Sequence, residues 1–334
     1  METENYLIIK DEKLEAFDIL RKAFTISASN IYFLIFTILT SLPLFFFLVY
    51  YEPFLQRFLL EISEIQEPSP SHYFNYYGSR VRPFQFQWSI PTVITRKLNN
   101  EFPGGLTQLA LVYLIPFHLL ELSTVLVIVD LASKKYIRRE ELEEEPPLTL
   151  NEMIHGRFDI TRLLGTVVTF VYVIIMSTCT LLGLVWLAAT YYVVVKFFHD
   201  VLVVLWCLVA FVALLTMYLG WSAGRNMSVV ISILERRHGT KAMALASCYS
   251  IGNGWRGFRL MLVFFAWEVC LRLPCMYFGC KKSWSVGILT QIGLFCLGNV
   301  VKWVAFTIYF YDCKNRDLER KLMMKAKKRA VESG

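Results

Sequence analysis

The sequence is poor in charged residues and lacks the motifs by which common enzyme classes are recognised. Only 18% of its 334 residues are charged, a low share for a soluble domain. It contains no Walker loop, GxSxG elbow, HExxH pair or dinucleotide fingerprint. Its five histidines are scattered over different segments, and no cysteine–histidine spacing resembles a zinc site. We therefore expect a non-enzymatic protein with no catalytic residues, no metal and no other cofactor.

Features of secreted proteins are also missing. None of the eight cysteines lies in residues 52–105, the longest polar stretch, so no disulfide framework is indicated there. The first 29 residues are charged and hold no apolar run that ends in a small-residue cleavage site. We expect the first apolar segment to act as an uncleaved signal anchor.

Long apolar stretches dominate what the sequence does contain. The chain is 56% hydrophobic and has a mean hydropathy of +0.48. A helix needs roughly 20 apolar residues to cross a bilayer, and unpaired backbone groups are not tolerated there. The sequence therefore predicts an all-α polytopic transmembrane bundle, with about six spans near residues 31–51, 106–129, 163–187, 201–221, 260–280 and 286–310.

The distribution of lysine and arginine predicts that both termini are cytosolic. With six spans, this orientation places 24 basic residues in the cytosolic segments and 8 in the outside segments. Cytosolic loops are the ones enriched in Lys and Arg. The expected organisation is a cytosolic N-terminal segment (1–30), a membrane domain (31–310) with an outside loop at 52–105 and cytosolic loops at 130–162 and 222–259, and a basic tail (311–334). The net charge of +7 thus reflects membrane orientation, and we expect no nucleic-acid partner.

Three short amphipathic segments are expected at the cytosolic surface. In residues 11–26, Leu14, Phe17, Leu20 or Arg21, and Phe24 recur near one face at helical spacing. A similar helix is expected after Asn151, a possible N-cap, and another in the segment that is broken at Gly239. The chain thus reads as three units, each an interfacial helix followed by a helical hairpin.

Several polar residues are expected at membrane depth. Ionisable groups there cost about 2.5–3.5 kcal/mol each on insertion scales, so they need partners or a function. Counting about 1.5 Å per residue from the span ends places acids and bases of spans two, five and six in two adjacent tiers. They form an ion-pair lock between these spans, line a cavity for a polar or zwitterionic substrate, or are placed by chance and reach the interface individually. The members are His118, Glu121, Glu268, Arg272, Asn299 and Lys302.

Basic clusters next to the spans are expected to contact anionic lipid headgroups. One follows span two and precedes a run of glutamates. The other lies in the tail, which reads equally as a handle for a protein partner. The residues are Lys134, Lys135, Arg138, Arg139, Lys325, Lys327 and Lys328.

Two segments carry a resemblance to a known group of proteins. They are residues 221–258, WSAGRNMSVVISILERRHGTKAMALASCYSIGNGWRGF, and residues 308–317, IYFYDCKNRD, with LRKAF before the first span. The chain resembles a plant family of multi-span membrane proteins of unknown function. That family is similar to the membrane region beside bacterial glycerophosphodiester phosphodiesterases. The HR…ExD metal-binding pattern of their catalytic domain is absent, so the resemblance implies a membrane architecture and no phosphodiesterase activity.

These observations favour a scaffold or a trafficking, lipid-interacting factor over two alternatives. One alternative is a transporter that moves a lipid or small polar solute past the polar residues of spans two, five and six. The other is an enzyme acting on lipids. We expect the partners to be membrane lipids and cytosolic proteins, in the endoplasmic reticulum, the wider endomembrane system or the plasma membrane. The sequence leaves the oligomeric state open.

Overall fold

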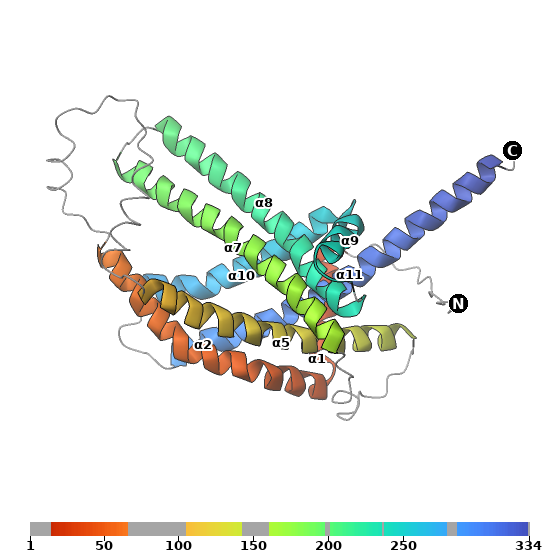
Figure 1. Cartoon of the computed structure of the whole chain (residues 1–334), viewed down its shortest axis with the longest axis horizontal. Helices are drawn as coiled ribbons and strands as arrows, with labels where there is room; N and C mark the ends of the chain where they lie inside the picture. Colours follow the sequence, from red (N-terminus) through yellow and green to blue (C-terminus); the bar gives the residue numbers. More distant parts are fainter. Residues whose placement is uncertain are drawn as a thin grey trace.

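The structure, a computed structural model, describes residues 15–65, 105–141, 160–197, 201–235, 237–278 and 286–332, and is helical almost throughout these ranges. No strand occurs in these ranges, which confirms the predicted all-α class. The helices, with the labels of Figure 1, are α1 (Ala16–Ala28), α2 (Ile31–Ile65), α5 (Gly105–Glu141), α7 (Ile160–Phe197), α8 (Val201–Leu234), α9 (Thr240–Ser250), α10 (Gly254–Phe278) and α11 (Val286–Glu332).

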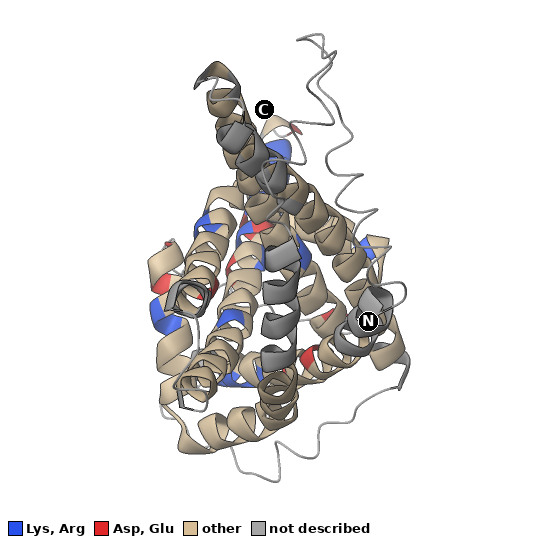
Figure 2. Cartoon of the chain, turned by 90° about the vertical axis from the view of Figure 1, so that its left-hand side faces the viewer, with Lys and Arg blue, Asp and Glu red and all other residues tan. Residues whose placement is uncertain are grey.

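Five of these helices contain segments long and apolar enough to cross a membrane. The segments are Ile31–Tyr51, Ile115–Arg138, Leu163–Leu184, Val204–Leu234 and Gly287–Arg329. Each overlaps a predicted span, and Figure 2 shows that most of the described ribbon belongs to residues other than Lys, Arg, Asp and Glu. The remaining prediction, 260–280, falls mostly in α10, whose side chains after Leu271 lie outside the described residues. Several of the helices continue past the predicted span ends, among them α5 to Glu141, α8 to Leu234 and α11 to Glu332.

Two of the three expected surface helices are present. In α1, Ala16, Ile19, Ala23 and Ile26 are buried against the bundle at helical spacing, whereas Phe17 and Phe24 are exposed. Helix α9 begins after Gly239, whose φ of 60° is a conformation that favours glycine, so the predicted break is confirmed. The third expected helix, after Asn151, lies outside the described residues, as do positions 66–104 of the outside loop.

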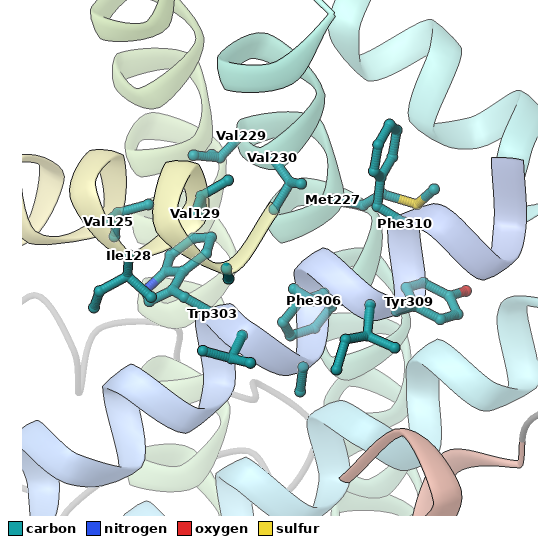
Figure 3. Close-up of a cluster of buried hydrophobic side chains, with 14 of the residues drawn as sticks. Val125, Ile128, Val129, Met227, Val229, Val230, Trp303, Phe306, Tyr309 and Phe310 are labelled. Atoms are coloured by element: carbon teal, nitrogen blue, oxygen red, sulfur yellow. The ribbon is translucent and has the colours of Figure 1, made fainter. Parts of the chain in front are cut away.

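Helix α11 is the central element of the bundle. It packs against α1, α2, α5, α8 and α10, while α7 packs chiefly on α8. In Figure 1, α7 and α8 run side by side and diverge from α2 and α5 at one end. Figure 3 shows the main core, where side chains from three helices meet: Val125, Ile128 and Val129 of α5, Met227, Val229 and Val230 of α8, and Trp303, Phe306, Tyr309 and Phe310 of α11.

The length of α11 has a structural consequence. Its 47 residues extend about 70 Å, roughly twice what a bilayer core requires. The stretch from Trp303 to Phe310 is buried on all sides, and residues 321–329 are exposed. Figure 1 shows this C-terminal end projecting beyond the other helices. One continuous helix, α11, therefore connects the core to the basic end of the chain.

Candidate functional site

The polar residues expected at membrane depth are distributed over three helices. On α5, His118 Nδ1 lies 3.2 Å from Glu121 Oε2, one turn away. On α11, the side-chain oxygen of buried Asn299 accepts a hydrogen bond of 3.1 Å from the indole N–H of Trp303. Lys302 Nζ lies 5.5 Å from the centre of the same indole ring. Each of these contacts joins two residues of the same helix.

The structure does not join these residues across helices in the part of the chain that it describes. Glu268 is half-buried on the face of α10 that also carries Met261 and Phe264, and no described side chain forms an ion pair with it. Its expected partner, Arg272, has a side chain that lies outside the described residues. Whether spans two, five and six share one polar belt therefore stays a prediction.

One residue expected at the lipid surface is placed elsewhere. Lys135 is only 2% exposed, and its Nζ donates hydrogen bonds to the carbonyl oxygen of Ile26 (2.6 Å) and to Ser29 Oγ (2.8 Å). Both acceptors lie at the C-terminal end of α1, where carbonyl groups lack helical partners and the helix dipole attracts a cation. The assignment of Lys135 to lipid contact was wrong, because this side chain caps α1 inside the protein.

The other residues expected to contact lipid are half-buried, exposed or outside the described residues. Lys134 forms an ion pair of 2.8 Å with Asp130, one turn earlier on α5. Arg138 is half-buried, and the side chain of Arg139 lies outside the described residues. In the tail, three lysines are exposed on the last turns of α11: Lys325, Lys327 and Lys328.

The sequence analysis missed a buried charge cluster between α10 and α11. Asp312 is only 7% exposed; its Oδ2 lies 3.2 Å from Arg256 Nη1, and its Oδ1 lies 3.0 Å from Arg316 Nη2. Arg316 Nη1 also donates to Asn253 Oδ1 at 3.5 Å, and the Tyr309 hydroxyl donates to the Asn253 carbonyl at 3.1 Å. We call these five residues the Asp312 cluster.

The Asp312 cluster joins the two segments on which the resemblance rests. Asn253 and Arg256 belong to IGNGWRGF, whereas Tyr309, Asp312 and Arg316 belong to IYFYDCKNRD. The signal was therefore present in the sequence, as two motifs with polar residues next to spans five and six. What the sequence did not indicate was that the two motifs contact each other.

A second polar contact ties α8 and α9 to the same part of α11. Lys314 Nζ lies 2.8 Å from Glu235 Oε1, and the Tyr249 hydroxyl donates to the same carboxylate oxygen at 3.3 Å. Burial, together with the neighbouring charge of Glu235, raises the pKa of Tyr249 well above its usual range. Tyr249 is therefore a neutral hydrogen-bond donor at physiological pH.

Arg225 is a further residue that the sequence analysis placed differently. It was expected in a cytosolic loop, and the structure places it in α8, within the 31-residue apolar segment Val204–Leu234. It is 5% exposed; its Nη1 donates to Thr180 Oγ1 at 3.3 Å, and its guanidinium lies 5.2 Å from the Tyr218 ring. Its Nη2 atom is buried and has no hydrogen-bond partner among the described residues.

The fold and these contacts define the class, a multi-pass α-helical membrane protein. No family model, curated protein or solved structure matches the chain. Among the described residues, no group of three or more His, Cys, Asp or Glu side chains is placed to hold a metal ion.

Proposed function

We propose that this protein is a non-enzymatic membrane scaffold or trafficking factor that recruits a cytosolic protein through the end of α11. The observation that supports the proposal is the continuity of α11 from the buried core, through the Asp312 cluster, to an exposed basic end. We call residues 321–332 the tail segment. It contains five Lys and Arg residues and one glutamate, so its surface suits an acidic partner.

The exposure of the tail segment suits a protein partner. Figure 1 shows the C-terminal end of α11 projecting beyond the other helices, and residues 321–329 are exposed. A cytosolic protein can therefore reach several sides of this helix, and its acidic side chains can pair with the exposed lysines.

Proximity labelling in cells tests this proposal. The test variant is Lys325→Gln/Lys327→Gln/Lys328→Gln, and the matched control is Arg21→Gln/Arg237→Gln/Lys241→Gln, which removes three exposed cations elsewhere. The tail variant should lose a defined set of labelled cytosolic proteins that the control retains, with equal membrane expression of both. The proposal fails if both variants label the same proteins as the unaltered chain.

A transporter is the second candidate, and Arg225 is the observation that favours it. Burying a guanidinium with an unpartnered nitrogen inside a candidate spanning segment costs free energy. Ionisable residues in such positions usually have a function. Lys302, expected at membrane depth in span six, belongs to the same hypothesis. Purified protein in liposomes should then move a solute, and Lys302→Met should abolish transport while expression and unfolding temperature stay unchanged. A loss of stability together with transport would point instead to a structural role for Lys302.

Three further properties are part of the proposal. Both termini face the cytosol, and the membrane is the endoplasmic reticulum, another endomembrane or the plasma membrane. The chain is related to the plant multi-span family that its motifs resemble. The supporting observation is that the residues of both motifs form one cluster, so they belong to one structural unit.

A further inference from the structure

Guanidinium groups from two helices surround the turn between α9 and α10. Gly252 in this turn has a φ of 79°, and a Cβ atom added there would lie 3.4 Å from Arg320 Nη2, so Arg320 packs directly on the turn. Arg316 binds the Asn253 side chain, and Arg256 follows at the start of α10. The turn thus brings Arg256 of α10 close to Arg316 and Arg320, which lie one turn apart on α11.

Two arginines at this turn have no ion-pair partner among the described residues. Arg256 and Arg316 both pair with the Asp312 carboxylate. Arg259 lies over the Trp255 ring at 5.5 Å, and neither it nor Arg320 forms an ion pair in the part of the chain that the structure describes. Lys314 and Lys321, by contrast, pair with Glu235 and Asp317. The guanidinium groups of Arg259 and Arg320 are therefore the ones available to an anionic ligand.

Two large apolar side chains are exposed beside these arginines. Ile251 and Trp255 are each 64% exposed, and Trp255 stacks on Phe258. They lie where α10 starts, at the cytosolic end of the predicted fifth span. Tryptophan is enriched at membrane interfaces, and an apolar side chain next to positive charge suits a surface with negative headgroups. We call Ile251, Trp255, Arg259 and the half-buried Arg320 the turn patch; Arg256 and Arg316 lie behind it, paired with Asp312.

We propose that the turn patch binds the phosphate headgroup of an anionic phospholipid in the cytosolic leaflet. A guanidinium presents parallel N–H donors that match phosphate oxygens, and several arginines favour a headgroup with more than one negative charge. Ile251 and Trp255 enter the headgroup layer beside it. This site is separate from the tail segment, so it stands whether or not the tail recruits a protein.

Lipid retention by the full chain tests the proposal. The purified protein is incubated with phosphatidylinositol bisphosphate in phosphatidylcholine, and the bound anionic lipid is counted by native mass spectrometry. The test variant is Arg259→Gln/Arg320→Gln, which leaves the Asp312 cluster intact. The matched control is Arg237→Gln/Lys241→Gln, two exposed cations outside the patch. Each cation removed from the patch should weaken binding about fivefold, so Arg259→Gln/Arg320→Gln should bind roughly 30-fold more weakly and the control should bind as the unaltered protein does.

Two further arms keep the outcome interpretable. The unfolding temperature of each variant in pure phosphatidylcholine should equal that of the unaltered protein, and Trp255→Ala should also reduce retention if the patch inserts into the interface. Lys325→Gln/Lys327→Gln should retain the lipid. Equal loss in patch and control variants, or loss that follows the tail variant, overturns the site. Binding of phosphatidylserine as tightly as of the bisphosphate overturns the preference for a multiply charged headgroup.

Discussion

Replacing Asp312 with asparagine removes the one carboxylate that Arg256 and Arg316 share, with almost no change in side-chain volume. The two guanidinium groups lie 3.2 Å and 3.0 Å from its oxygens, and the carboxylate is only 7% exposed. Both arginines are then left without this partner at the junction of α10 and α11. We expect the substitution to destabilise that junction.

The magnitude follows from burial. Removing one member of a buried ion pair costs about 3–5 kcal/mol. The Arg256 and Arg316 side chains retain 21% and 15% exposure, so water recovers part of this cost and we expect about 2–3 kcal/mol. The matched substitution is Asp317→Asn, whose partner Lys321 is 62% exposed. An exposed pair of this kind contributes about 0.5 kcal/mol or less.

The assay is thermal unfolding of the protein in lipid nanodiscs, followed by tryptophan fluorescence. Asp312→Asn should lower the unfolding temperature clearly, whereas Asp317→Asn should leave it nearly unchanged. Because Asp312 and Arg316 act within one cluster, Asp312→Asn/Arg316→Gln should cost less than the sum of the single substitutions. If both aspartate variants unfold at the same temperature, the Asp312 cluster does not stabilise the bundle and the reasoning is refuted.

Three other predictions follow from the described contacts. Lys135→Met removes the hydrogen bonds to the Ile26 carbonyl and the Ser29 hydroxyl at the end of α1, at a cost of about 1–3 kcal/mol. Amide hydrogen exchange in α1 should therefore accelerate, whereas Lys134→Met should not change it. The pKa of Tyr249 is raised in the folded state, so its contribution to stability is complete below its unfolded pKa of about 10 and is lost at higher pH; Tyr249→Phe should flatten the fall of the unfolding midpoint above that pH. An otherwise cysteine-free chain carrying exposed Cys248 should react with an impermeant maleimide from the cytosolic side, and one carrying buried Cys313 should not; labelling of Cys248 from the opposite side would reverse the proposed orientation.

Hydropathy and local backbone preferences alone determined the class of the protein. The apolar runs predicted the spans because a bilayer requires a minimum length of apolar helix, and that requirement does not depend on what the helix packs against. The break at Gly239 could also be predicted from the sequence, because a positive φ is a local property of the backbone that favours glycine. The sequence did not indicate that the segment after residue 221 continues α8 without a break, because it is less apolar than the span before it and its burial depends on neighbouring helices.

Only the tertiary structure decided which polar residues meet. The sequence placed Lys135 in the basic cluster after span two. In the structure this side chain is buried and donates a hydrogen bond to a carbonyl group at the C-terminal end of α1. Asp312 and Arg256 are 56 residues apart, and their contact depends on how α10 and α11 pack at the turn after α9. Counting charges treats each segment separately, whereas an ion pair between two segments forms only if their side chains lie within a few ångströms of each other. The geometry of helix packing, which no single segment encodes, therefore determined both the Asp312 cluster and the turn patch.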